Sequence, residues 1–252
     1  MKKKHLLAPG PTPLFPEAVR EMSTPIIHHR ASEFAAVLQE VRENLKYLFQ
    51  TNNDVLLLSS SGTGAMEGAV INFLSPGDRA LVVRGGKFGE RWGELCQVYG
   101  VALETIEVPW GEAVDPREIA SRLRQCPDIK AVFTQASETS TGARYDVQTI
   151  GKIVQGYEKT ILVVDAITAL GVFPLQTDNW GLDVVVAGSQ KALMLPPGLA
   201  LVSVSRKAWG LAEEAKLPRY YFDFQKERKA LAKNQNAYTP AVSLVMGLRE
   251  VL

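Results

Sequence analysis

Short apolar runs alternate with longer helical patterns along most of the chain, from about residue 54 to residue 204. Most of these runs are apolar without interruption, which is typical of strands whose two faces are both covered by helices. Seven runs are candidate strands, at residues 55–60, 80–84, 103–108, 131–135, 161–165, 184–187 and 199–204. Helical patterns lie between them, at residues 63–74, 91–99, 116–124 and 147–157. The alternation predicts an α/β fold with a mainly parallel, seven-stranded sheet between helices.

The two ends of the chain differ from this middle. Residues 1–30 are rich in proline and predict an irregular N-terminal arm. An amphipathic helix follows at residues 32–49, capped by Ser32, and its apolar side consists of Phe34, Val37, Leu38, Val41, Leu45 and Leu48. Residues 241–252 also have a helical pattern, which no glycine, asparagine or proline closes. We therefore expect a large domain at residues 31–240, and at 241–252 the start of a helix that leads to a C-terminal small domain missing from this sequence.

The composition argues against several classes of protein. The residues are 46% hydrophobic and 22% charged, as in ordinary globular proteins, and the formal net charge is +1, so we expect neither a nucleic-acid nor a membrane partner. Cys96 and Cys126 lack metal-ligand spacing and are too few for a disulfide framework. The first eight residues carry positive charge without the apolar stretch of a signal peptide. We expect a soluble protein of the reducing cytoplasm, without a metal site.

A glycine-rich turn, Ser61-Gly62-Thr63-Gly64, joins the first predicted strand to a helix. Such a turn aims backbone N–H groups and the positive end of the helix at one point, which suits a phosphate group. Gly62, Gly64 and Gly68 also match a dinucleotide-binding pattern loosely, but the third glycine is one place late and no acidic residue ends the next strand. The turn is a candidate phosphate site, and a simple tight connection is the alternative.

Two chemically useful residues follow other predicted strands. Asp165 ends the run at 161–165, and its carboxylate is costly to bury unless a cation or a donor accompanies it. A metal ligand, a helix cap and the partner of a protonated heterocycle all remain open for it. Lys191 follows the run at 184–187 through a short turn, and a lysine held against a sheet edge can lose its proton and form an imine. An ordinary surface lysine is the alternative.

These three features, taken together and in this order, indicate a kind of cofactor that none of them indicates alone. A phosphate cradle, an acidic strand end and a lysine-bearing strand end are what an aldehyde cofactor with a phosphate and a pyridine nitrogen requires. The chain resembles the class V (fold-type I) pyridoxal-phosphate aminotransferases, in particular the alanine–glyoxylate and serine–glyoxylate group. The resemblance covers nearly the whole chain and rests on the motifs Ala8-Pro9-Gly10-Pro11-Thr12, Ser61-Gly62-Thr63-Gly64, Ser137-Glu138-Thr139-Ser140-Thr141-Gly142, Val164-Asp165-Ala166 and, most specifically, Gly188-Ser189-Gln190-Lys191-Ala192 followed by Pro196-Pro197-Gly198.

The resemblance implies roles for four residues around the ring of pyridoxal 5'-phosphate. Lys191 would hold the cofactor as a Schiff base and then move a proton between the substrate Cα and the cofactor's C4′ carbon. Asp165 would pair with the pyridinium nitrogen and keep it protonated. Thr139 would donate to the phenolic oxygen. Phe88 would stack on the ring; a core phenylalanine at the start of a helix is the alternative.

The resemblance also assigns the phosphate group and the assembly. Ser61, Gly62 and Thr63 match the phosphate cradle, and Gln190 lies beside it. Thr239 matches a phosphate ligand that relatives lend across a two-fold interface, which implies a homodimer; Tyr238 is a weaker candidate for the same role. The alternative for Thr239 is a helix cap before Pro240.

The implied reaction is transamination between a small amino acid, alanine or serine, and the oxo acid glyoxylate. Relatives line the substrate site at positions that match Gly10, His29 and Arg30. In this family an arginine of the small C-terminal domain binds the substrate α-carboxylate. No arginine of this sequence is given that role.

Three other functions are weighed against this one. A pyridoxal-phosphate lyase or desulfurase has the same fold, but a desulfurase usually has histidine before the lysine, where this chain has Gln190. A non-catalytic nucleotide-binding protein would leave Asp165 and Lys191 without a function. A hydrogenase metal centre needs clustered thiolates, which Cys96 and Cys126 do not supply.

Overall fold

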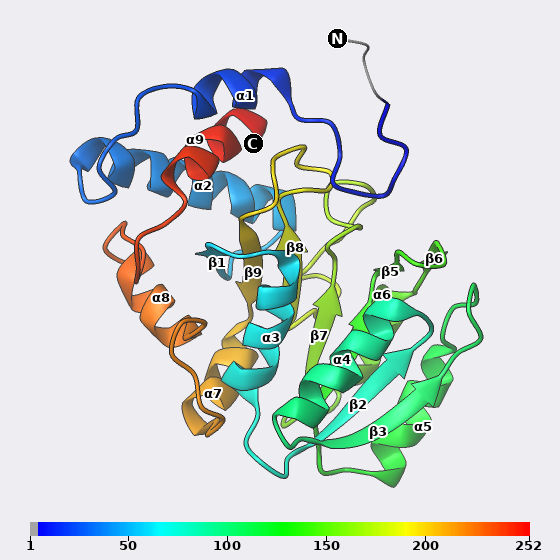
Figure 1. Cartoon of the computed structure of the whole chain (residues 1–252). Coiled ribbons are helices and arrows are strands. Elements are labelled where there is room, and N and C mark those ends of the chain that lie inside the picture. The colour runs from blue at the N-terminus through cyan, green and yellow to red at the C-terminus, as the bar shows by residue number, and fades with distance from the viewer. Residues whose placement is uncertain (1–4) are drawn as a thin grey trace.

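A mixed, mostly parallel sheet organises the fold of the computed structural model, which describes residues 5–252 (Figure 1). Its strands are β1 (Asp54–Leu58), β2 (Arg79–Arg84), β3 (Ala102–Glu107), β4 (Ile129–Gln135), β7 (Ile161–Asp165), β8 (Val184–Gly188) and β9 (Ala200–Val204). They lie in the order β1-β9-β8-β7-β4-β2-β3. The strand β9 runs in the opposite direction to the other six strands of this sheet, between β1 and β8. The predicted seven-stranded, mainly parallel sheet is confirmed, and each predicted strand agrees with an observed one to within two residues.

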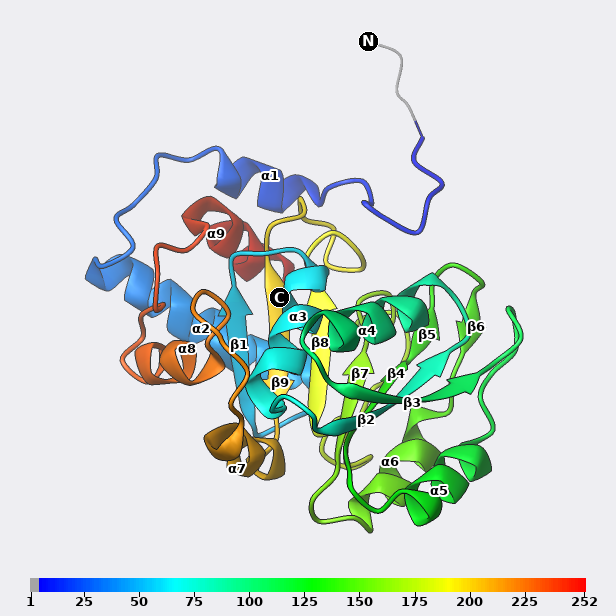
Figure 2. The same cartoon turned by 60° about the horizontal axis from the view of Figure 1, so that its bottom comes forward.

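Helices cover both faces of the sheet (Figure 2). One face carries α3 (Gly62–Phe73) and α4 (Lys87–Val98), and the other carries α5 (Pro116–Gln125) and α6 (Val147–Gln155). This division follows from right-handed crossovers, because the chain moves toward β3 through α3 and α4 and returns toward β8 through α5 and α6. A two-stranded hairpin, β5 (Ser137–Glu138) and β6 (Ala143–Arg144), follows β4. The hairpin was not predicted.

The ends of the chain are more regular than their composition indicates. The prediction that residues 1–30 are irregular is wrong for α1 (Pro16–Met22), a short helix with proline in its first turn that packs against α9 (Val242–Val251). Residues 1–4 of the predicted arm lie outside the described residues. Further helices are α2 (Ser32–Phe49), α7 (Arg206–Glu214) and α8 (Phe224–Leu231). The side chains of Ser205 and Asp223, which precede α7 and α8, cap these two helices.

Two details of α2 correct the sequence analysis. Ser32 is the first residue of the helix and not its cap; the capping position is Ala31, without a side-chain cap bond. The Ser32 hydroxyl instead donates to the neighbouring carboxylate of Glu33 at 3.2 Å. On the apolar side, Phe49 is fully buried, whereas Leu48 is only partly buried. The helical period brings residue 49 to the core because it lies four residues after the buried Leu45.

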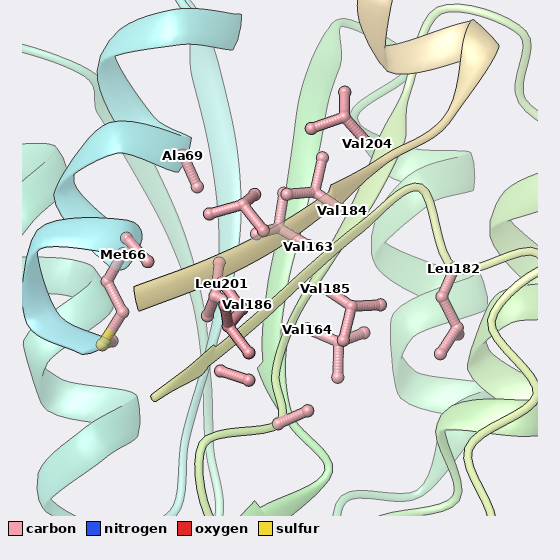
Figure 3. Packing of buried hydrophobic residues seen from close by; sticks show 14 of the residues in the cluster. Met66, Ala69, Val163, Val164, Leu182, Val184, Val185, Val186, Leu201 and Val204 are labelled. Atoms are coloured by element: carbon pink, nitrogen blue, oxygen red, sulfur yellow. The ribbon is translucent and has the colours of Figure 1, made fainter. Parts of the chain in front are cut away.

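The core lies between α3 and the central strands (Figure 3). Met66 and Ala69 of α3 lie over the central strands, where Val163 of β7, Val184 and Val186 of β8 and Val204 of β9 share one face of the sheet. Each of these side chains is buried. Burial of one valine or methionine side chain stabilises the folded state by about 1.5–3 kcal/mol. A core of this kind fixes the positions of the strand ends.

The carboxyl ends of β1, β2, β4, β7 and β8 share one edge of the sheet, because these strands are parallel to one another. The loops that follow them carry nearly all the residues singled out in the sequence. Within residues 5–252, no helix combines the length and the apolar character needed to cross a membrane.

Candidate active site

Lys191 lies just after the carboxyl end of β8, in a turn that the N-terminal arm crosses. Thr12 binds this turn twice: its backbone N–H donates to the carbonyl of Gln190 at 3.2 Å, and its hydroxyl donates to the carbonyl of Lys191 at 2.9 Å. Phe15 N–H donates to the carbonyl of Met194 at 2.8 Å. The arm therefore holds the backbone of the lysine turn in place from outside the sheet. Burial lowers the pKa of the Lys191 amine, and the negative charge of Asp165 opposes this shift.

Asp165 ends β7, which is paired with β8 in parallel. Its carboxylate is almost completely buried, and the backbone N–H of Ile167 donates to its Oδ1 at 2.8 Å. Burial raises the pKa of Asp165 to about 7; the charge of Glu138 adds to the rise, whereas the hydrogen bond from Ile167 and the charges of Arg91 and Lys191 lower it. The site thus holds a buried acid whose ionised form is incompletely compensated.

The helix α3 begins at the candidate phosphate cradle. Its capping residue is Ser61, which makes no side-chain cap hydrogen bond within the described part of the chain. Gly62 is buried, and a methyl group added to it would lie 2.4 Å from Cδ1 of Ile167, two residues after Asp165. Thr63 is exposed, and its hydroxyl accepts a hydrogen bond from Arg91 at 3.2 Å. The start of α3 therefore lies beside the end of β7 with its first N–H groups uncapped by a side chain.

Gln190, next to Lys191 in the chain, has its side-chain amide near this helix start. A methyl group added to Gly188 would lie 3.0 Å from Oε1 of Gln190 and 3.5 Å from the backbone nitrogen of Gly62. The Oε1 atom of Gln190 is buried and finds no hydrogen-bond partner among residues 5–252. An amide oxygen accepts hydrogen bonds, so only a donor could satisfy it, whereas the NH2 group of the same amide could donate to an anion.

Phe88 and Thr139 come from the loops after β2 and β4. Phe88 is half-buried in the first turn of α4, and the guanidinium of Arg91 lies 4.9 Å from its ring centroid. The Thr139 and Thr168 hydroxyls are hydrogen-bonded to each other at 2.8 Å, and the Thr168 hydroxyl also lies 3.4 Å from the carbonyl of Ser137. The structure thus has both residues at the sheet edge that carries Asp165 and Lys191.

Thr239 is exposed in the loop between α8 and α9, and this loop contacts the segment before the cradle, since the backbone N–H of Ala241 donates to the Ser59 hydroxyl at 3.0 Å. Thr239 does not cap a helix, since α9 begins at Val242 with Ala241 in the capping position. Tyr238, next to it, stacks on Tyr221 with a centroid distance of 5.2 Å. Arg30 is engaged with the same loop through donation to Oε1 of Gln235 at 2.8 Å and to the carbonyl of Asn236 at 3.2 Å.

Four residues near the site were not singled out in the sequence: Thr12, Arg91, Glu138 and Thr168. Thr12, like Glu138, lies inside a quoted motif, so its position was visible but its contacts were not. Arg91 follows Phe88 by three residues, which puts both on one face of α4. Thr168 has no sequence signal that distinguishes it from a core threonine. Its place at the site depends on the hydrogen bond between its hydroxyl and that of Thr139, 29 residues earlier in the chain.

The two cysteines lie in different parts of the fold. Cys96 is buried within α4, and Cys126 caps the C-terminus of α5. Burial raises the pKa of the Cys96 thiol to about 12, so it is a poor source of thiolate. Among the described residues, no three or more His, Cys, Asp or Glu side chains gather in a way that would hold a metal ion.

Comparison with known proteins decides the family. A model of the family Aminotransferase class-V matches residues 15–252. The chain belongs to the class-V aminotransferase family. The crystal structure of alanine–glyoxylate aminotransferase from Nostoc sp. superposes with a TM-score of 0.94 at 30% identity, over 100% of this chain and 67% of that chain. The predicted family and the predicted fold class are both confirmed.

Two relatives show how this class-V family member compares in sequence and length. A protein of Anabaena cylindrica named soluble hydrogenase 42 kDa subunit is 48% identical over 252 residues, which are 99% of this chain and 66% of the relative. The L-aspartate–glyoxylate aminotransferase of Paracoccus denitrificans is 37% identical over 247 residues, which are 96% of this chain and 62% of the relative. The chain thus spans somewhat less than two thirds of the length of these relatives. Their names describe those proteins.

Proposed function

We propose that the protein binds pyridoxal phosphate through Lys191 and transfers an amino group between a small amino acid and glyoxylate. The observation that carries this proposal is the pair Asp165 and Lys191. A buried acid and a half-buried amine follow two adjacent parallel strands, and each perturbs the pKa of the other. The opposite ends of this cofactor need such a pair: an acid for its ring nitrogen and an amine for its aldehyde.

The residues present fit the cofactor on three counts. The carboxylate of Asp165 is buried with one backbone donor, so a protonated ring nitrogen would supply the cation that it lacks. The start of α3 has no side-chain cap and suits a phosphate group. The side-chain amide of Gln190 lies near Gly62 at the same helix start, and its NH2 group is the part that would donate to a phosphate oxygen. The phosphate dianion would thus meet the positive end of α3, and the protonated ring nitrogen would meet the carboxylate of Asp165.

Bound pyridoxal phosphate would supply an aldehyde that captures an amino group and a protonated ring that takes up the electrons released at the substrate Cα. Lys191 would first attach to that aldehyde and, once the substrate amine has displaced it, carry the proton from Cα to C4′. The lowered pKa of the Lys191 amine favours its neutral form, which is the form that accepts a proton. Asp165 would hold the proton on the ring nitrogen. Thr139 and Phe88 would orient the ring, and the start of α3 with Gln190 would hold the phosphate.

Alanine or serine is the proposed amino donor, and glyoxylate the acceptor. Glycine at position 10 and threonine at position 139 leave small groups beside Lys191 and the ring position. Small substrates have little area to recognise, so selection would rest on carboxylate binding and on the exclusion of larger side chains. Glyoxylate is supported by the names of two relatives, an alanine–glyoxylate and an L-aspartate–glyoxylate aminotransferase.

The test is a transamination assay on the whole protein with glyoxylate as acceptor and alanine, serine or aspartate as donor. Glycine formation is followed by mass spectrometry at equal donor concentrations. We expect kcat/KM for alanine or serine to exceed that for aspartate. A clear preference for aspartate would contradict the proposed donor, and no glycine from any donor would contradict the proposed reaction.

A further inference from the structure

The side chain of Glu138 is fully buried although it is charged. It lies in β5, one residue before Thr139. Its Oε2 accepts hydrogen bonds from the backbone N–H groups of Phe88 at 3.2 Å and Gly89 at 3.0 Å. Its Oε1 accepts from Ser140, through the backbone N–H at 3.1 Å and the hydroxyl at 2.7 Å. Four donors from two loops therefore meet on one carboxylate.

These bonds replace the missing cap of α4. Gly86 occupies the capping position and has no side chain to cap with. Instead, Ser140 Oγ accepts from the first N–H of the helix, that of Lys87, at 3.0 Å, and Glu138 accepts from the next two. A negative charge at this end of a helix is also favoured by the helix dipole. Glu138 and Ser140 together satisfy the donors of the first turn, from a segment about 50 residues further along the chain.

Gly86 makes this approach possible. A methyl group at position 86 would lie 2.6 Å from Cγ and from Cδ of Glu138 and 2.5 Å from Oγ of Ser140. The carboxylate is thus pressed directly against the backbone that precedes α4. An arrangement this close admits little displacement of either segment.

We propose that Glu138 is a positioning residue, which fixes Phe88 relative to Thr139 and thereby sets the geometry of the cofactor ring between the two loops. This inference rests on the proposed function. The backbone of Phe88 is bonded to Glu138 directly, and Thr139 is the next residue in the chain. One rigid contact thus joins the residue expected to stack on the ring to the residue expected to bind its phenolic oxygen. The charge of Glu138 also raises the pKa of Asp165, as expected for a carboxylate close to the ring-nitrogen position.

The test uses Glu138→Gln in the whole protein, because the amide has nearly the size of the carboxylate. One of its two terminal groups is an NH2 donor, which faces backbone N–H groups and cannot accept from them. Ser140→Ala is the second variant; it removes the hydroxyl at an exposed residue and leaves the carboxylate. Glu90→Gln is the matched control, since Glu90 lies on α4 and its one ion pair among residues 5–252 is with the exposed Lys87.

Two readouts separate positioning from general stability. Hydrogen exchange of the Phe88 and Gly89 amides in the cofactor-free protein reports the contact itself. The dissociation constant of pyridoxal phosphate and the circular dichroism band of the bound cofactor report its consequence. We expect Glu138→Gln to lose protection at both amides, to weaken cofactor binding on the order of tenfold or more, and to reduce the dichroism band. Ser140→Ala should shift all three in the same direction by less, and Glu90→Gln should match the unsubstituted protein.

Each other outcome has a definite meaning. Amide protection unchanged in Glu138→Gln, or lost without any change in cofactor affinity and dichroism, would overturn the positioning role. If Glu138→Gln does not fold, Ser140→Ala decides by the same criteria. Absence of cofactor binding in the unsubstituted protein would overturn the proposed function instead, whatever the exchange data show about the contact.

Discussion

Gly10 lies directly against the side chain of Lys191. A methyl group added to Gly10 would lie 2.5 Å from Cδ and 2.7 Å from Nζ of that lysine, and the φ angle of +156° disfavours any other residue there. The two residues are 181 positions apart in the sequence. Thr12 keeps them together through its two hydrogen bonds to the lysine turn. The N-terminal arm is therefore part of the lysine's surroundings.

Replacing Gly10 by alanine should displace the Lys191 amine and weaken cofactor capture. The added methyl group cannot be accommodated unless the lysine side chain or the arm moves. We expect the dissociation constant of pyridoxal phosphate, measured by absorbance, to rise on the order of tenfold, equivalent to about 1.4 kcal/mol. Gly210→Ala is the control, because a methyl group at that helical position meets nothing within 4 Å. Equal affinity in Gly10→Ala and the unsubstituted protein would show that the arm does not restrict Lys191.

Asp165 should make the stability of the cofactor-free protein depend on pH. Its folded pKa of about 7 lies above the ordinary value of 3.8, so the folded state holds the proton more tightly than the unfolded state. The resulting stability is full below about pH 4, falls as the pH rises between the two pKa values, and is lost above pH 7. Asp165→Asn removes this dependence. Above pH 7 the free energy of unfolding of the variant, measured with denaturant, should therefore exceed that of the unsubstituted protein by about 1–4 kcal/mol. A less stable variant at pH 8 would contradict this.

With cofactor and substrate present, the same substitution should lower the activity of the protein. Asp165→Asn removes the negative charge that holds the ring-nitrogen proton, while the side chain keeps its size. We expect kcat to fall by roughly 100-fold or more, with a smaller loss of cofactor affinity. Steady-state kinetics at saturating cofactor would measure it. Activity close to that of the unsubstituted protein would mean that Asp165 does not serve the ring nitrogen.

Thr239 should serve the site of a second subunit. It is exposed on its own chain, and we predict a two-fold dimer in which it binds the phosphate of the partner's cofactor. Thr239→Val should weaken cofactor binding by roughly tenfold, the loss of one hydrogen bond to a charged group. Mixing this variant with Lys191→Ala subunits should restore activity, because each mixed dimer then has one intact site. No restoration, or a stable monomer with full cofactor in sedimentation, would refute the shared site.

Most of the fold was predictable because its signals are local. Continuous apolar runs mark strands that helices cover on both faces, and the run at 161–165 coincides with β7. The errors occurred where tertiary contacts override local composition. Pro16–Met22 forms a helix despite its proline-rich surroundings because α1 packs on α9, some 220 residues later. Ser32 looked like a cap by residue type alone, and backbone geometry places the cap one residue earlier.

The candidate site, like the fold, was only partly predictable from the sequence. Asp165 and Lys191 were visible because Asp165 ends one apolar strand and Lys191 follows another through a short turn, and parallel strands bring such ends together. The contacts that hold them were not visible. The bond between Thr12 and Lys191 spans 179 residues, and that between Glu138 and Gly89 spans 49. No pattern along one chain encodes which loops meet at this distance. Motif membership marked Glu138 as part of the site, but only the structure shows that its side chain turns away from Thr139 to bind α4.

The central claim is that Lys191 holds the cofactor, and one measurement addresses it directly. Protein incubated with pyridoxal phosphate is reduced with borohydride, which converts the bond between a lysine and the cofactor's aldehyde carbon into a stable amine, and is then mapped by peptide mass spectrometry. We predict a single stoichiometric label on Lys191, absent from Lys191→Ala although that variant folds normally. A stoichiometric label on a different lysine, or no label on the unsubstituted protein, would contradict the assignment.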